Sequence, residues 1–248
     1  MLLPPSEGKA SGGAGPAWDT ASGAFGALAK ARREVVRELV RAARSGELLA
    51  ALDGTEPHRR AAVATDKAVK TGPTAPALQR YAGVLCSVLD APSLPPAARR
   101  RAGGFVHVSG LAGLVAGSDP LPDYSAPIGL RLAALGGLGP WWKPRLSPVL
   151  DEHVRDAVVW DLLPAAHAAA WKDGETYARR WRVRVLSEAA DGRRTTVSHD
   201  NKSSKGLLAR ELAQAPAATP ADLRDWATAH GLLLEVDGGR VDVVRLPR

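Results

Sequence analysis

Apolar and polar positions along the chain follow two spacings, one typical of helices and one typical of strands. Between Gly26 and Leu52, apolar residues recur every three or four positions, and arginines and glutamates fill the positions between them. This spacing predicts an amphipathic helix with one core face and one solvated face. Shorter helices are expected over residues 61–69, 77–89, 148–155, 203–212 and 220–229.

Short apolar runs between these helices predict strands. Residues 1–3, 105–108 and 157–162 are such runs. Residues 180–187 alternate charged and apolar side chains, as in a half-exposed strand, and residues 231–245 predict a terminal hairpin. Because strands and helices are intermixed and no long linker or internal repeat divides the chain, the sequence predicts one α/β (α+β) domain with a mixed β-sheet flanked by helices.

The composition agrees with one folded domain over residues 1–248 and narrows the class of partner. Hydrophobic residues make up 45% of the chain, which is enough for a core and excludes disorder as the dominant state. The formal net charge of +7 favours polyanions such as nucleic acid or phosphorylated small molecules. Surface arginines kept for solubility are the alternative explanation.

Several classes of protein are not expected from this sequence. No apolar stretch reaches the ~18 residues of a membrane span, and the N-terminus lacks the features of a signal peptide, so we expect a cytoplasmic protein without a membrane partner. The single cysteine, Cys86, lies in an apolar run, where a buried and inert thiol is expected. The scattered histidines have no partner at metal-ligand spacing, so neither a metal nor a cofactor is expected.

The first candidate site follows the N-terminal apolar run. Residues Pro4–Lys9 read Pro-Pro-Ser-Glu-Gly-Lys, in which the prolines end the strand and Gly8 allows a tight turn. Backbone N–H groups, Ser6 and Lys9 could together hold a phosphate. The glycine spacing of a Walker A loop is absent, and a structural turn with exposed charges is the alternative.

The second candidate site lies in the most basic segment, Arg179–Arg210, which holds nine Lys/Arg and three acidic residues. A helix is expected to start near Ser203, with Lys202, Lys205 and Arg210 at or near its start. Cations there oppose the helix dipole, and a bound anion would offset that cost.

The third candidate site is formed by Ser109 and Tyr124. Ser109 directly follows the buried run 105–108, and loops at the ends of strands are where α/β proteins place their sites. Glycines and prolines are frequent over residues 109–129, which predicts a loop. A glycine-rich packing turn is the alternative.

These segments, taken together and in this order, resemble the YaaA family of bacterial peroxide-stress proteins, also called UPF0246. The resemblance covers nearly the whole chain. The similar segments are Leu2–Lys9, Gln79–Val84, Val108–Leu114 with Asp119–Tyr124, Val158–Leu162 and Ser198–Arg210. It implies an α/β "cantaloupe" fold with a helix-hairpin-helix-like element, binding of double-stranded DNA and protection against hydrogen peroxide. The positively charged cleft of the family would here carry Lys9, Lys202, Lys205 and Arg210.

The chain also departs from the pattern of the family. Residues 112–117 lack the aromatic residue and the arginine that the family usually has there, and Ser125 stands in place of another arginine. Lys205 replaces an arginine, which keeps the charge but loses the bidentate fork. The resemblance therefore implies a divergent member.

Two functions follow from these observations. The first is a DNA-binding peroxide-stress protein whose basic cleft contacts phosphates, with the ligand-binding residues Ser6, Lys9, Ser109, Tyr124, Lys202, Lys205 and Arg210. The alternative is an enzyme that acts on a nucleotide or nucleobase in the same cleft, with Glu7 and Lys9 as its acid–base pair. The partner is accordingly double-stranded DNA or a phosphate-bearing small molecule.

Overall fold

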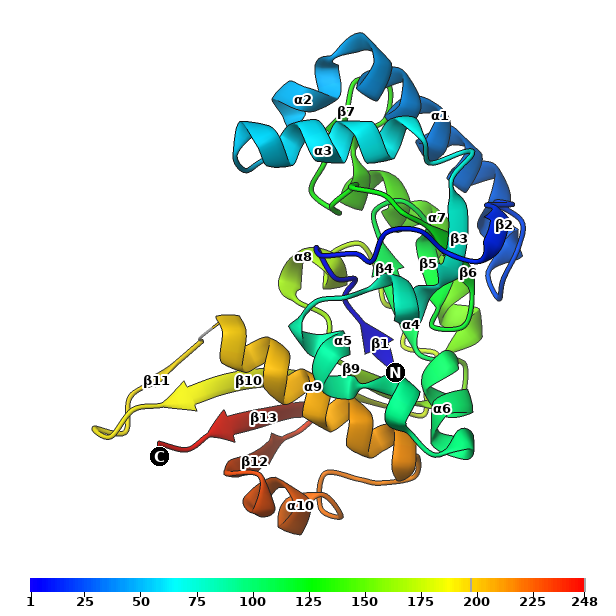
Figure 1. Ribbon diagram of the computed structural model, residues 1–248. Helices are drawn as coiled ribbons and strands as arrows, with labels where there is room; N and C mark the ends of the chain where they lie inside the picture. Colours follow the sequence, from blue (N-terminus) through cyan, green and yellow to red (C-terminus); the bar gives the residue numbers. More distant parts are fainter. Residues whose placement is uncertain (197, 248) are drawn as a thin grey trace.

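The computed structural model describes residues 1–196 and 198–247, and its central feature is a mixed sheet of eight strands (Figure 1). The strand order is β12-β13-β10-β9-β1-β4-β5, with β11 paired to β10. The strands are β1 (Leu2–Leu3), β4 (Val106–Ser109), β5 (Gly113–Ala116), β9 (Val158–Asp161), β10 (Arg179–Glu188), β11 (Arg194–Thr195), β12 (Leu232–Asp237) and β13 (Arg240–Arg245). The predicted α/β fold with a mixed sheet is confirmed.

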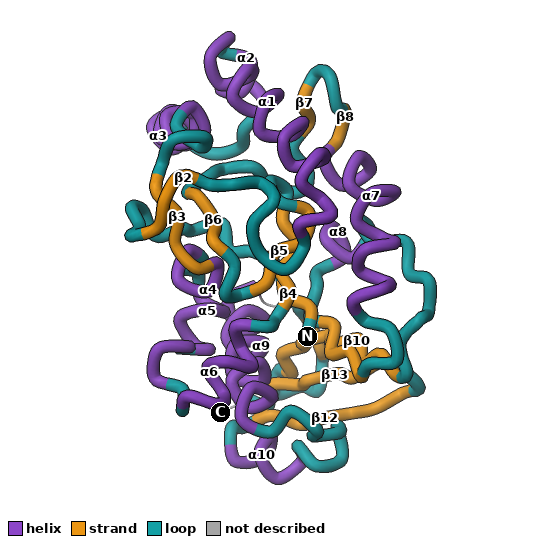
Figure 2. Tube along the Cα trace, turned by 90° about the vertical axis from the view of Figure 1, so that its right-hand side faces the viewer, coloured by secondary structure: helices purple, strands orange, loops and turns teal. Residues whose placement is uncertain are grey.

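Helices cover both faces of this sheet, and others lie farther from it. They are α1 (Ala29–Ser45), α2 (Glu47–Ala51), α3 (Glu56–Lys67), α4 (Ala77–Arg80), α5 (Val84–Leu89), α6 (Pro96–Gly103), α7 (Leu138–His153), α8 (Ala165–Ala168), α9 (Ser198–Gln214) and α10 (Arg224–Ala229). Short strands form two further small sheets, one of β2 (Gly15–Ala17), β3 (Pro73–Pro76) and β6 (Pro120–Pro122), the other of β7 (Arg131–Leu132) and β8 (Gly136–Gly137). Figure 2 shows α7 and α9 on opposite sides of the central strands.

A very short strand lies in the interior of the large sheet. β1 has only two residues, yet it pairs in parallel with β4 on one side and with β9 on the other. Successive side chains of a strand point to opposite faces. Leu2 therefore packs into the core cluster that includes residues of α1 and α7, and Leu3 into the cluster that includes residues of α5 and α9. The N-terminus thus joins the two cores of the molecule.

Several elements match the predicted ones. The predicted helix from Gly26 to Leu52 is present, but Gly46, with φ of 87°, divides it into α1 and α2. The half-exposed strand is β10, and the terminal hairpin consists of β12 and β13. The helix-hairpin-helix-like element stays a prediction; α4 and α5, joined by residues 81–83, are two short helices in succession.

Three predicted boundaries are wrong. Residues 109–129 are not all loop, because Gly113, with φ of 69°, lets the chain reverse and β5 pair antiparallel with β4. The helix predicted to start at Pro148 starts at Leu138, with Pro144 and Pro148 inside it. The helix predicted to start at Ser203 starts at Ser198, so Lys202 and Lys205 lie within α9 and not at its cap.

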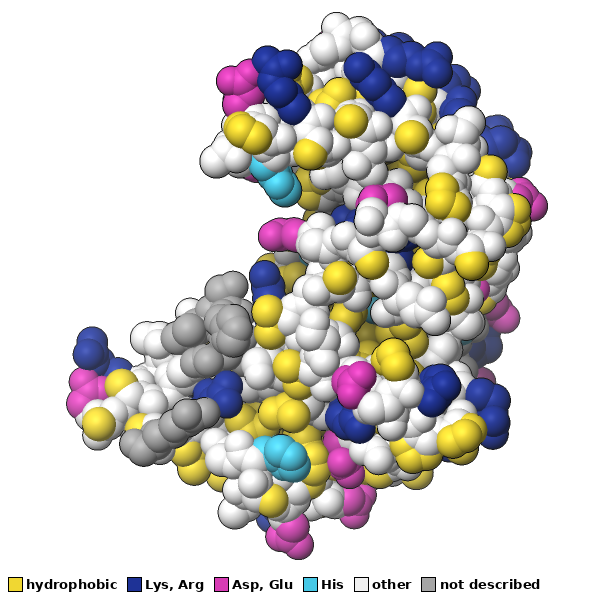
Figure 3. Space-filling view, in the orientation of Figure 1, with side chains coloured by type: hydrophobic (Ala, Val, Ile, Leu, Met, Phe, Trp, Pro, Cys, Tyr) yellow, Lys and Arg dark blue, Asp and Glu magenta, His cyan; other side chains and the backbone are white. Residues whose placement is uncertain are grey.

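A deep hollow separates the α1–α3 part of the molecule from α9 and the β10–β11 hairpin (Figure 3). The loop that follows β1 passes beside α8 at the inner end of this hollow before it crosses to β2 (Figure 1). Among the described residues, no helix is long and apolar enough to cross a membrane.

Leu3→Ala should destabilise the fold by about 2–5 kcal/mol, because Leu3 is 0% exposed and its deletion leaves a cavity at the centre of the sheet. The free energy of unfolding is measured by urea denaturation followed by tryptophan fluorescence. Leu246→Ala, at a site 41% exposed, is the matched control and should cost much less. Equal losses for the two variants would contradict a central role for β1.

Candidate functional site

The carboxyl ends of three parallel strands meet at one edge of the sheet. β1 pairs in parallel with β4 and with β9, so the segments after Leu3, Ser109 and Asp161 leave the sheet on the same side. Loops at such an edge are where open α/β sheets bind their ligands. The structure thus brings the first and third candidate sites of the sequence together.

The N-terminal loop is fixed by main-chain pairing with the segment between α4 and α5. Lys9 and Tyr81 form an antiparallel bridge, and the N–H of Ala82 donates to the carbonyl of Gly8 at 3.0 Å. Gly83 lies directly against Ser6, because a Cβ atom built on it would be 2.0 Å from Ser6 Oγ. The Arg80–Gly83 segment therefore holds the loop in place.

Arg80 holds the same loop in place through hydrogen bonds of its side chain. It is fully buried, and its guanidinium donates to the main-chain carbonyls of Ala10, Gly12, Pro73 and Leu121. Burial lowers the pKa of Arg80, while the charge of nearby Asp123 opposes that effect. Because its N–H groups are occupied by protein carbonyls, Arg80 stabilises the loop and is not available to a phosphate.

Three hydroxyl groups form a chain beneath the loop. Tyr124 Oη is 2.9 Å from Tyr81 Oη and 2.8 Å from Ser109 Oγ, and the N–H of Ala112 donates to Ser109 Oγ. Burial raises the pKa of Tyr124 to about 12, so its phenol stays protonated at neutral pH. Ser109 and Tyr124, predicted as ligand-binding residues, thus lie in direct contact.

Lys9 is a half-buried lysine with few partners. Its Nζ lies 4.3 Å from the centroid of the Tyr124 ring and donates to the carbonyl of Glu7 at 3.3 Å. Burial lowers the pKa of Lys9 to about 8, although the charges of Asp123 and Asp66 act in the opposite direction. A lysine in such a setting is partly neutral near physiological pH.

Asp66 of α3 is a buried carboxyl group whose charge acts on this lysine, as does the charge of Asp123. The residue is 0% exposed; its Oδ1 accepts the N–H of Ser125 at 2.7 Å, and its Oδ2 has no partner within the described part of the chain. Burial raises the pKa of Asp66 to about 7. Sequence reasoning missed Asp66, because an aspartate near the end of a short helix carries no local signal of burial.

Glu7, His167 and Lys205 lie on the side of the loop that faces α8 and α9. Glu7 is exposed, and its charge acts on His167, whose pKa burial lowers to about 4. Lys205 is buried and donates from Nζ to the carbonyl of Leu162 at 2.8 Å. Burial lowers the pKa of Lys205 to about 8. Lys205 of α9 thus lies near the carboxyl edge of the sheet, but its ammonium group is hydrogen-bonded to a main-chain carbonyl.

The two remaining predicted cations lie in different settings. Lys202 is exposed on the first turns of α9. Arg210 donates to the carbonyls of Leu89 and Asp90, at the end of α5, and therefore joins two helices. The side chains of Ser198, His199 and Asp200, which open the same sequence segment, lie outside the described residues. The four cations predicted for the cleft thus lie in different environments. Lys205 and Arg210 are held by main-chain carbonyls of neighbouring elements, whereas Lys9 and Lys202 are more available to a ligand.

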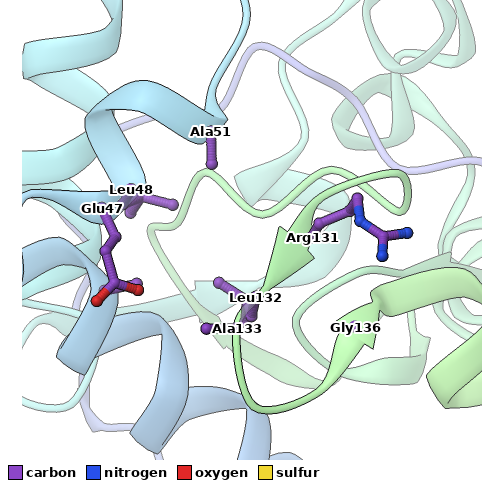
Figure 4. Close-up of a pocket in the computed structure, with 8 residues that line it drawn as sticks. Glu47, Leu48, Ala51, Arg131, Leu132, Ala133 and Gly136 are labelled. Atoms are coloured by element: carbon purple, nitrogen blue, oxygen red, sulfur yellow. The ribbon is translucent and has the colours of Figure 1, made fainter.

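A separate pocket of about 300 Å³ lies between α2 and the β7–β8 hairpin (Figure 4). Glu47 and Arg131 stand at opposite sides of it, and the Glu47 carboxylate is bonded to Arg41. Its remaining lining is mostly apolar, with Leu48 and Leu132 facing each other across it. None of the predicted site residues lines this pocket.

Comparison with known proteins decides the family. The family model described as peroxide stress protein YaaA matches residues 1–235. The chain belongs to this family. It is similar to the UPF0246 protein SCO2297 of Streptomyces coelicolor, with 40% identity over 97% of this chain and 95% of that protein. It is also similar to the UPF0246 protein CE1889 of Corynebacterium efficiens, with 35% identity over 99% of this chain and 98% of that protein.

Membership in the YaaA family confirms the resemblance found in the sequence, including its extent. The segments that carried the resemblance do not lie scattered in the fold. The N-terminal loop, Arg80–Gly83, Ser109 and Tyr124 contact one another, and Lys205 approaches from α9. The described geometry therefore groups most of the family segments around one edge of the sheet.

Asp66→Asn should stabilise the protein in a pH-dependent manner. A carboxyl whose folded pKa is about 7 and whose unfolded pKa is near 4 stabilises the fold below pH 4, and this contribution is lost as the pH rises towards 7. The asparagine keeps the acceptor for Ser125 and avoids the buried charge. We expect no gain at pH 4 and a gain on the order of 2–3 kcal/mol at pH 8.

The measurement is urea denaturation of both proteins from pH 4 to pH 8. Asp53→Asn, at an exposed position, is the control and should show no such trend. A variant that is less stable than the natural protein at pH 8 would mean that Asp66 is held as a stabilised anion, and that its pKa is not raised in the folded protein.

Proposed function

We propose that this member of the YaaA family is a DNA-binding peroxide-stress protein that receives the DNA backbone in the hollow of Figure 3. The observation that carries the proposal is the placement of lysine-bearing segments at this hollow. The N-terminal loop with Lys9 lies at its inner end, and α9, with exposed Lys202, forms one side. A net charge of +7 supports a polyanionic partner.

The contacts expected from these residues are mainly sequence-independent. Lys202 would meet a phosphate directly, because its side chain is exposed. Ser6 and the main chain of the loop would act deeper in the hollow, close to Lys9, where Ser109 and Tyr124 are buried. Phosphate contacts position a protein on DNA and make its affinity depend on salt.

An enzyme that acts on a nucleotide or nucleobase is the second candidate, and one observation favours it. Lys9 is half-buried and Asp66 is buried, and both have shifted pKa values, as expected for groups that exchange protons. Glu7 was the predicted partner of Lys9, but its side chain is exposed and acts on Lys9 through its charge, while the described hydrogen bond from Lys9 goes to the Glu7 main-chain carbonyl. Asp66 is therefore the better acid–base partner under this hypothesis.

Lys202→Ala should weaken DNA binding and lower its salt dependence. Fluorescence anisotropy with a labelled duplex of about 20 base pairs, titrated at several salt concentrations, gives the affinity and the slope of log K against log salt. Loss of one phosphate contact should reduce the slope by about 0.9. Lys143→Ala removes the same charge from an exposed position of α7 and should leave the slope unchanged.

Two outcomes would count against the proposal. If the natural protein does not bind the duplex even at low salt, DNA binding is excluded. If both lysine variants reduce the slope equally, the binding reflects the overall charge and not the hollow.

A further inference from the structure

The Lys9 amine has an environment that suits a nucleophile better than a phosphate contact. Its only described hydrogen bond is the 3.3 Å contact with the carbonyl of Glu7, and no carboxylate lies within ion-pair distance in the described part of the chain. The face of the Tyr124 ring lies against it. Lysines that form Schiff bases are found in such partly desolvated places, because the neutral amine is the reactive form.

Asp66 supplies what an amine nucleophile needs nearby. Asp66 accepts the N–H of Ser125, the residue that follows Tyr124, and the ring of Tyr124 lies against the Lys9 amine, so the two groups lie in the same region. Their charges also act on each other. Asp66 Oδ1 is fixed by the N–H of Ser125, while Oδ2 has no partner among the described atoms. A buried carboxyl oxygen without a partner is rare in folded proteins and calls for a functional explanation. Oδ2 is free to accept or donate a proton.

We propose that Lys9 forms a Schiff base with the aldehyde of an abasic site in DNA, and that Asp66 carries the proton in this reaction. The inference rests on the proposed function, because the aldehyde belongs to damaged DNA. It adds an activity to what would otherwise be backbone binding alone.

The reaction balances with groups that are present. The lone pair of neutral Lys9 Nζ attacks the aldehyde carbon, and the C=O bond becomes a C–O bond as the C–N bond forms. Asp66 takes a proton from the nitrogen and returns it to the oxygen. With one further proton from solvent this oxygen leaves as water, and the cationic imine of Lys9 remains. No oxidant, reductant or metal is required.

The chemistry of the site favours a ring-opened sugar over other groups of DNA. Asp66 and Asp123 both lie near Lys9, and their charges would repel a phosphate placed directly on the amine. The Tyr81, Tyr124 and Ser109 hydroxyls offer neutral polar groups instead. A nucleotide without its base costs least to extrude from a duplex, so it is the one that can reach a half-buried lysine.

Borohydride trapping tests the proposal directly. The full-length protein is incubated with a labelled duplex that carries one abasic site, in the presence of sodium cyanoborohydride, which reduces an imine to a stable amine. We expect a covalent protein–DNA product with the natural protein and with Lys143→Ala. Lys9→Met should reduce the product to background, and Asp66→Asn should slow its formation by at least about tenfold.

The pH profile separates a chemical role of Asp66 from a structural one. Trapping should increase with pH as Lys9 loses its proton, with a midpoint near 8. Removal of the Asp66 charge should move this midpoint to lower pH, because that charge raises the pKa of Lys9. A merely structural role would lower the yield without moving the midpoint.

Anisotropy with the same duplex distinguishes the possible failures. Binding without any trapped product would overturn the Schiff-base proposal and leave DNA binding intact. Neither binding nor product would remove both proposals. Undiminished product with folded Lys9→Met would assign the chemistry to another amine, such as the α-amine of Met1, and would also overturn the proposal.

Discussion

The insertion of two leucines into the centre of the sheet is the constraint on which the rest of the structure depends. β1 gains its hydrogen bonds from β4 and β9, and its side chains enter opposite cores. Because the strand is so short, Pro4 begins the loop directly at the carboxyl edge of the sheet. The loop therefore delivers Ser6, Glu7 and Lys9 to the place where β4 ends at Ser109.

The burial of ionisable groups at this site lowers the stability of the folded protein. Lys9, Asp66 and Lys205 are ionisable groups in buried or half-buried positions, and burial shifts the pKa of each towards its neutral form. Arg80 offsets part of this cost, since it binds the carbonyls that hold the loop. Buried ionisable groups at this edge of the sheet lower the stability of the fold, as is common at functional sites.

Local patterns predicted much of the fold and the main segments of the site. The alternation in β10 and the Pro-Pro-Ser-Glu-Gly-Lys turn depend on neighbouring residues, which a sequence displays. The break at Gly46 was not predicted, since the spacing of apolar residues indicated one helix from Gly26 to Leu52. Asp66 could not be found in this way, because its burial and its hydrogen bond with the N–H of Ser125, 59 residues later in the chain, depend on tertiary packing. Arg210 was predicted as a ligand contact, but its bonds to the end of α5 depend on tertiary packing. The start of α7 was misplaced because its internal prolines argue against a helix that tertiary contacts nevertheless stabilise.

The edge formed by β1 and β4 holds a lysine amine coupled to a buried carboxyl group. The most direct measurement is a titration of Lys9 by NMR, with its side-chain carbon and nitrogen signals assigned by comparison with Lys9→Met. We expect a pKa near 8 for Lys9, and a further decrease when Asp66 is replaced by asparagine. An ordinary lysine pKa near 10.5, unaffected by Asp66→Asn, would show that the two groups are not coupled.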